Sequence, residues 1–144
     1  MIRHAGLVAL RLGGDWLGVL IEGPSGSGKS DLALRCLSDG FRLVADDRVI
    51  IWSSGGQVWG RAPDTLAGLL ESRGVGVLPA PAIRHARIRL AIRCVASPEQ
   101  VERLPGEETL ELLGLAVPVR PLWPFDPAAP AKLRRIIEHL GAEP

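Results

Sequence analysis

The chemistry of this chain is clearest between residues 23 and 30, which read Gly-Pro-Ser-Gly-Ser-Gly-Lys-Ser. This stretch matches the pattern G-x-x-x-x-G-K-[ST] of a phosphate-binding loop. Its glycines allow backbone conformations in which successive N–H groups turn toward one anion. Lys29 would add positive charge at the β- and γ-phosphates, and Ser30 would offer its hydroxyl to Mg²⁺. The pattern predicts that nucleotide phosphates bind at Gly23, Pro24, Ser25, Gly26, Ser27, Gly28, Lys29 and Ser30.

A second chemical feature is the acidic pair Asp46-Asp47, which directly follows the apolar residues 43–45. In phosphate-loop proteins, the carboxylate that organises Mg²⁺ comes at the end of a strand beside the loop. One carboxylate could therefore hold the metal while its neighbour takes a proton from an attacking hydroxyl. Because side chains alternate along an extended chain, we expect the two carboxylates to point in different directions. An ordinary acidic turn after a strand is the alternative interpretation.

These residues need a strand before the loop, a helix after it and a strand that ends at the acidic pair. Residues 16–22 are apolar and short enough for a buried strand, and residues 6–12 predict its hairpin partner. The apolar spacing of residues 30–39 favours a helix, which Gly40 would end. Residues 41–45 predict the strand that leads to the acidic pair. Strand, glycine loop and helix thus follow one another in the order that the motif requires.

The rest of the chain predicts further strands and short helices. Five prolines make residues 116–130 a loop or extended arm rather than a helix interior. An amphipathic C-terminal helix follows Asp126, which would cap it. The length fits one domain, residues 1–144, with an α/β fold, a mixed central sheet and the phosphate loop at a strand-to-helix turn. Extended segments are predicted at 48–52, 57–61, 74–78 and 87–94, and short helices at 63–71 and 107–115.

Composition narrows the classes of function. The formal net charge is +1 and aromatic residues are 4% of the chain, so neither broad positive charge nor many stacking side chains favour nucleic-acid binding. No apolar run approaches the roughly 20 residues of a membrane span, and the N-terminus lacks a signal-peptide pattern. Cys36 and Cys94 have no metal-binding spacing and are expected to be packed thiols. We therefore expect a cytoplasmic protein without nucleic-acid or membrane partners.

Three blocks of sequence, in this order, resemble the catalytic domain of bacterial HPr kinase/phosphorylase. Residues 23–50 contain Gly-Pro-Ser-Gly-Ser-Gly-Lys-Ser-Asp-Leu-Ala-Leu and then Gly-Phe-Arg-Leu-Val-Ala-Asp-Asp-Arg-Val. Residues 60–63 read Gly-Arg-Ala-Pro, and residues 69–77 read Leu-Leu-Glu-Ser-Arg-Gly-Val-Gly-Val. His4, ahead of the first predicted strand, also matches. The joint occurrence of these blocks is far more specific than the phosphate loop alone.

The resemblance implies an activity, cofactors and partners. That family phosphorylates a serine of HPr, the phosphocarrier of the sugar phosphotransferase system, and many members also remove the phosphate by phosphorolysis. It implies a fold like that of phosphoenolpyruvate carboxykinase, ATP and Mg²⁺ as cofactors, HPr as partner, and a homo-oligomer. Typical members carry an extra N-terminal domain. Because this chain begins almost at the catalytic domain, it is similar to the short form found in alphaproteobacteria.

The resemblance also implies a role for each candidate residue. Asp47 matches the general base that deprotonates the serine hydroxyl and that serves as general acid in the reverse reaction. The metal-binding residues that it implies are Ser30, Asp46 and Glu71. The other catalytic residues that it implies are Lys29, His4 and Arg103. Plainer alternatives stay open: a solvated helix end for Glu71, a surface histidine for His4 and a loop charge for Arg103.

One segment departs from the family pattern. Residues 118–121 read Pro-Val-Arg-Pro, like a family segment tied to dephosphorylation, but Leu122 and Trp123 stand where that segment continues with Gly-Arg. Whether phosphorolysis is retained, and how HPr docks, therefore stay open.

Two other functions compete with an ATP-dependent protein-serine kinase. A small-molecule kinase usually carries an arginine-rich lid and a defined acceptor pocket, which the acidic pair and the block at residues 69–77 fit less well. A regulatory module that senses ATP without transferring phosphate has no need for a base such as Asp47 beside the metal. The sequence therefore favours the kinase.

Overall fold

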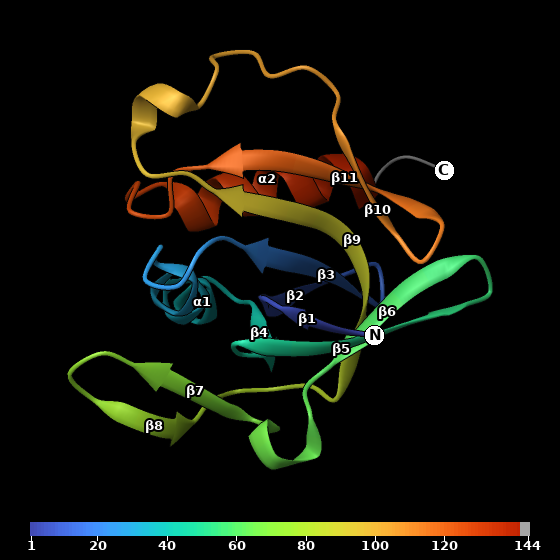
Figure 1. The fold of residues 1–144 in the computed structure, drawn as a ribbon, viewed down its shortest axis with the longest axis vertical. Helices are drawn as coiled ribbons and strands as arrows, with labels where there is room; N and C mark the ends of the chain where they lie inside the picture. The colour runs from blue at the N-terminus through green and yellow to red at the C-terminus, as the bar shows by residue number, and fades with distance from the viewer. Residues whose placement is uncertain (142–144) are drawn as a thin grey trace.

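The computed structural model describes residues 1–141, which fold into one curled sheet with two α-helices and a separate hairpin (Figure 1). The helices are α1 (Lys29–Ser38) and α2 (Ala129–Gly141), with short 3-10 turns at Asp64–Leu66 and Pro98–Gln100. The strands are β1 (Ile2–His4), β2 (Gly6–Leu12), β3 (Asp15–Glu22), β4 (Arg42–Ala45), β5 (Arg48–Ser54), β6 (Gln57–Arg61), β7 (Leu69–Ser72), β8 (Gly76–Pro79), β9 (His85–Cys94), β10 (Thr109–Leu112) and β11 (Leu115–Leu122).

The sheet is mixed, as the sequence predicted. Within residues 1–141, nine strands form it in the order β1-β5-β6-β9-β3-β2-β4, while β11 lies beside β9 and pairs with β10. The pairs β3–β9 and β9–β11 are parallel, and the β2–β3 hairpin is antiparallel. The β7–β8 hairpin stands apart from this sheet, below α1 in Figure 1. The α/β fold class expected from the sequence is therefore confirmed.

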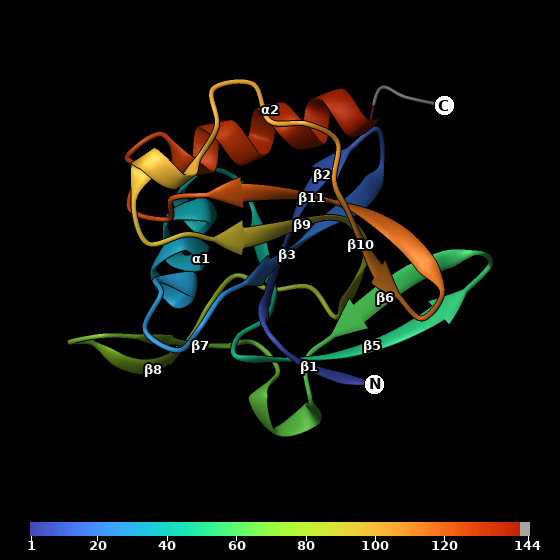
Figure 2. The ribbon, with the colours of Figure 1, turned by 45° about the horizontal axis from the view of Figure 1, so that its top comes forward.

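Both faces of the sheet are buried. On one face, Ile21 belongs to a cluster with Leu133 of α2, and α1 and α2 both pack on this side (Figure 2). On the other face, the curl of the sheet brings Leu20 into a cluster with Ile51 of β5. Because side chains alternate along a strand, β3 contributes neighbouring residues to both clusters. The central hairpin is thereby fixed as the base from which the phosphate loop projects.

Two predicted short helices are wrong. Residues 63–71 form a 3-10 turn followed by β7, and residues 107–115 contain β10 and the turn into β11. Both segments are short apolar runs, for which periodicity alone cannot separate a buried strand from a helix. In each case an antiparallel partner is present, β8 for β7 and β11 for β10, and this pairing satisfies the backbone groups.

The proline-rich arm predicted at residues 116–130 is partly a strand of the sheet. β11 contains Pro118 and Pro121, which lack a backbone donor. The first half of β11 pairs with β10 and the second half with β9, so each half has one free side on which a missing N–H costs little. The predicted C-terminal helix is confirmed as α2, and the Asp126 carboxylate accepts a hydrogen bond from the Ala128 amide at 2.9 Å just before it.

The cysteines are packed thiols, as predicted. Cys36 and Cys94 are both free and buried. Burial raises the pKa of the Cys36 thiol to about 12 and that of the Cys94 thiol to about 11, where the charge of Lys29 opposes part of the effect. In the part of the chain that is described, neither helix has the length and apolar character of a membrane span.

Gly18 supplies a stability test of the central strand pair. A Cβ on Gly18 would lie 2.7 Å from the Arg87 carbonyl oxygen and 3.1 Å from Leu7 Cδ1, at a point where the β3–β9 register is irregular. A backbone carbonyl cannot move aside as a side chain can, so Gly18→Ala should lower the free energy of unfolding by about 1–3 kcal/mol. Urea denaturation measures this loss. Gly106→Ala is the matched control, because no atom lies within 4 Å of its added Cβ, and it should be neutral; equal stability of the two variants would contradict the close approach of β3 and β9.

Candidate functional site

The phosphate loop lies between β3 and α1, as its motif predicted. The Ser27 amide donates to the Pro24 carbonyl at 3.1 Å, which closes the loop into a turn. Gly26 and Gly28 have φ values of 79° and 102°, in the region that side chains disfavour, so glycine is required at both. The Ser27 hydroxyl is buried without a hydrogen-bond partner, although buried polar atoms are usually satisfied. This geometry suits a loop that takes up an anion.

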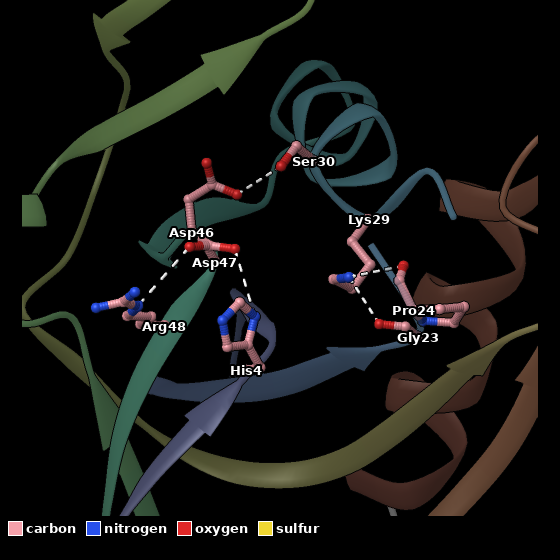
Figure 3. Close-up of polar contacts among 8 residues, drawn as sticks. All are labelled: His4, Gly23, Pro24, Lys29, Ser30, Asp46, Asp47 and Arg48. Carbon is pink, nitrogen blue, oxygen red and sulfur yellow. Dashed lines mark hydrogen bonds and ion pairs between the residues drawn. The ribbon is translucent and has the colours of Figure 1, made fainter. Parts of the chain in front are cut away.

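Lys29 is the first residue of α1, and its side chain folds back over the loop (Figure 3). Its Nζ donates to the carbonyl oxygens of Gly23 at 2.7 Å and Pro24 at 3.0 Å. The ammonium group is therefore held above the loop by neutral acceptors. Anionic phosphate oxygens would bind it more strongly, because charge-assisted hydrogen bonds are about twice as strong as neutral ones.

Ser30 and Asp46 are joined directly. The Ser30 hydroxyl donates to Asp46 Oδ1 at 2.7 Å (Figure 3). Asp46 Oδ2 accepts a hydrogen bond from the backbone amide of Glu71 at 3.0 Å. Asp46 is the one charged residue among the buried residues of the described chain, with 8% of its surface exposed. A hydroxyl and a carboxylate in contact at the start of α1 are oxygen ligands of the kind that Mg²⁺ prefers.

Asp47 points away from Asp46, as expected, although the cause is a turn rather than strand alternation. Its φ is 69°, a rare value for a residue with a side chain, and its carbonyl oxygen accepts the Ala5 amide at 3.1 Å. Its carboxylate is 57% exposed and lies 3.6 Å from His4 Nδ1 and 3.9 Å from Arg48 Nε (Figure 3). The structure thus brings Asp47 and His4 together, with the carboxylate accessible from solvent.

The side chains of Glu71 and Arg103 make no hydrogen bond or ion pair with the other candidate site residues. The Glu71 amide contacts Asp46, but its side chain is exposed. No group of three or more His, Cys, Asp or Glu side chains within residues 1–141 could by itself hold a metal ion. Arg103 lies in the exposed loop that leads to β10, and its guanidinium makes no hydrogen bond or ion pair with any described residue. Their implied roles stay predictions.

Sequence reasoning missed how the N-terminus reaches the site. β1 is a three-residue strand, too short for periodicity to reveal, and its register with β5 places His4 opposite Arg48. The neighbouring Arg3 donates from Nη2 to Oε1 of Glu22 at 3.3 Å, and its Nε contacts the other carboxylate oxygen. Glu22 is the last residue of β3, directly before the phosphate loop. This ion pair ties the strand that carries His4 to the strand that carries the loop.

Comparisons with known proteins agree with this geometry. The family model described as the HPr serine kinase C-terminal domain matches residues 4–122. The HPr kinase/phosphorylase of Streptococcus thermophilus is 38% identical over 113 residues, which is 71% of this chain and 37% of that protein. That of Bordetella pertussis is 42% identical over 112 residues, 70% of this chain and 36% of that protein. The chain therefore spans little more than a third of the length of these relatives.

A solved structure extends the comparison to the fold. The structure of the Hpr(Ser) kinase/phosphatase from Coxiella burnetii matches with a TM-score of 0.80 and 25% identity, over 96% of this chain and 89% of that chain. The match includes α2, which lies beyond the residues that the family model covers. With its phosphate loop, acidic pair and sheet in the arrangement described above, this chain belongs to the HPr serine kinase C-terminal domain family.

Proposed function

We propose that this protein is an ATP-dependent kinase that phosphorylates a serine of the phosphocarrier HPr. The observation that carries the proposal is the division of the acidic pair. Asp46 is buried against Ser30, whereas Asp47 is exposed beside His4. One carboxylate is thus available for a metal and the other for a proton of an incoming hydroxyl. The names of the relatives, HPr kinase/phosphorylase, support HPr as the acceptor.

The residues of the site fit ATP and Mg²⁺. The buried Ser27 hydroxyl lacks a partner, and Lys29 has neutral carbonyls as its acceptors, so the loop has unused capacity for phosphate oxygens. Ser30 and Asp46 would hold Mg²⁺, with Glu71 as a further carboxylate that would have to turn inward. When bound, Mg²⁺ would neutralise charge on the phosphates and so favour attack by an oxygen nucleophile.

Asp47 would serve as the general base. A serine hydroxyl is a poor nucleophile. A positioned carboxylate that accepts its proton during attack typically raises the reaction rate by about 10²- to 10⁴-fold. His4 lies beside one oxygen of this carboxylate and Arg48 beside the other. Its exposure gives a serine on a protein surface a route to it. Lys29 would stabilise the charge on the transferred group, and Arg103 would have to approach from its loop to assist.

We also propose the domain organisation, cellular location, oligomeric state and regulatory role of the protein. Residues 1–144 would act as a single catalytic domain in a cytoplasmic homo-oligomer that regulates the sugar phosphotransferase system. Phosphorolysis would transfer the phosphoryl group from the serine of HPr to inorganic phosphate, which gives pyrophosphate, and Asp47 as general acid would return the proton to the serine oxygen. Leu122 and Trp123 replace the residues that follow Pro-Val-Arg-Pro in the family, so this activity is measured separately, by adding inorganic phosphate to phosphorylated HPr.

Replacing Asp47 tests the function and the base together. Asp47→Asn keeps the size of the side chain but removes the proton acceptor, so kcat for HPr phosphorylation should fall by about 10²–10⁴-fold while ATP affinity changes by less than about threefold. Intact mass spectrometry of HPr after incubation with MgATP measures the transfer. Asp15→Asn changes an exposed acid at the start of β3; it is the matched control and should retain the wild-type rate.

Three other outcomes of this assay would change the assignment. Full activity of Asp47→Asn would remove Asp47 as the base. ATP binding without transfer to HPr by the wild-type protein would favour a sensing module. Transfer to a small metabolite but not to HPr would favour a small-molecule kinase.

Replacing Ser30 tests the metal site. Ser30→Ala removes the hydroxyl that donates a hydrogen bond to Asp46 and that would bind Mg²⁺. The Mg²⁺ concentration needed for half-maximal ATP binding should rise by about 10–100-fold, the usual effect of losing a group in or next to a metal's ligand set. Calorimetric titration of ATP at several Mg²⁺ concentrations measures it. Ser38→Ala, exposed at the other end of α1, serves as control. An unchanged Mg²⁺ requirement would place the metal elsewhere.

A further inference from the structure

An aromatic ring lies against the phosphate loop and has no role in the chemistry described so far. Phe125 belongs to the segment between β11 and α2. A Cβ built on Gly28 would lie 2.8 Å from Phe125 Cζ and 3.3 Å from Pro124 Cγ, so the ring is in direct contact with the loop. Nevertheless, 52% of Phe125 is exposed to solvent. The chain has two phenylalanines, and the other, Phe41, is completely buried.

The segment that carries this ring is fastened to α1. Arg35 of α1 donates from Nη1 to the Asp126 carbonyl oxygen at 3.2 Å, and its Nη2 contacts the Pro124 carbonyl oxygen. Asp31, one turn earlier, holds the same guanidinium by accepting from Nε at 3.0 Å. The backbone on both sides of Phe125 is therefore held by one arginine of the helix that the loop begins.

The other end of the segment is also fixed. The Asp126 carboxylate accepts a hydrogen bond from the Ala128 amide and forms an ion pair with Lys132 of α2. The hydrogen bond from Lys132 is the main reason why the pKa of Asp126 is lowered, so the carboxylate remains ionised and paired at neutral pH. The exposed ring is thus presented on a backbone that both helices hold in place, which reduces the entropy lost when a ligand packs on it.

We propose that Phe125 is the surface on which the nucleobase of the bound nucleotide packs. The proposal rests on the function proposed above only in that the loop takes a nucleoside triphosphate. Phosphates held by residues 23–30 leave the base and ribose to extend over the rim of the loop, and Phe125 is the exposed aromatic ring that touches this rim. Stacking of a base on an aromatic side chain is worth about 1–3 kcal/mol, and it uses the face of the base rather than its hydrogen-bonding edge.

The test compares a ligand that has a base with one that lacks it. Isothermal titration in Mg²⁺ buffer would measure the affinities of the wild type, Phe125→Leu and Phe125→Trp for ATP and for inorganic triphosphate. Phe125→Leu keeps an apolar side chain on Gly28 but removes the aromatic face, so ATP affinity should fall by about 5–30-fold, the equivalent of a lost stacking contact. Affinity for triphosphate should change by less than about twofold. Phe125→Trp should bind ATP at least as tightly as the wild type.

Leu34→Ala is the matched control, because Leu34 is an apolar residue of α1 that is 40% exposed, and it should leave both affinities unchanged. Circular dichroism and thermal unfolding confirm that each variant is folded. Equal losses for ATP and triphosphate would overturn the proposal, since the ring would then only support the loop. Unchanged ATP affinity in Phe125→Leu would overturn it as well.

The same titrations separate this proposal from the kinase assignment. If the wild type bound neither ligand, the nucleotide site itself would be wrong and both ideas would fall. If Phe125→Leu lost ATP affinity selectively while the wild type did not phosphorylate HPr, the base-packing surface would stand and the proposed acceptor would fall.

Discussion

The hydrogen bond between Ser30 and Asp46 is the constraint on which the site depends. A buried carboxylate is costly unless its oxygens are satisfied, and Asp46 is satisfied by two partners from different elements. One is the hydroxyl at the start of α1, and the other is the backbone amide of Glu71 in β7. Helix α1, the turn after β4 and the outlying β7–β8 hairpin are therefore held at one point. Since β2 already pairs with both β3 and β4, this contact adds a direct link between the phosphate loop and the acidic pair to the frame that the sheet supplies.

The second constraint is the backbone of Asp47. A residue with a side chain at φ 69° carries a strain of order 1–3 kcal/mol, which the surrounding structure must offset. Here the Arg48 amide donates to the Asp46 carbonyl at 2.8 Å, and the Ala5 amide donates to the Asp47 carbonyl. The turn is thus closed by a hydrogen bond of its own and held by a second hydrogen bond from Ala5, near the N-terminus. Its result is that two adjacent carboxylates face different surroundings, one buried and one open to solvent.

The sequence predicts the parts of the fold and site that are local. The phosphate loop, the β2–β3 hairpin and α1 each have a motif or a periodicity of their own, and all three are confirmed. β7 and β10 are strands because each forms a hairpin with the segment that follows it, β8 and β11, whereas their short apolar runs taken alone fit a helix as well as a strand. β11 differs, because its pairing with the distant strand β9 overrides its proline content, and a local pattern does not contain that information. The position of Glu71 shows the limit within the site, because its backbone, not its carboxylate, meets Asp46.

The long-range contacts explain where the parts of the site lie relative to the sheet. The Arg3–Glu22 ion pair joins an edge strand to the central strand that leads into the loop, and this places His4 and Asp47 at the rim of the sheet. Asp46 is buried and accepts the hydroxyl of Ser30 at the start of α1, and Phe125 lies against the loop at Gly28. The Asp47 carboxylate is 57% exposed, so an incoming hydroxyl would have a route to it from solvent, whereas Asp46 stays buried against Ser30.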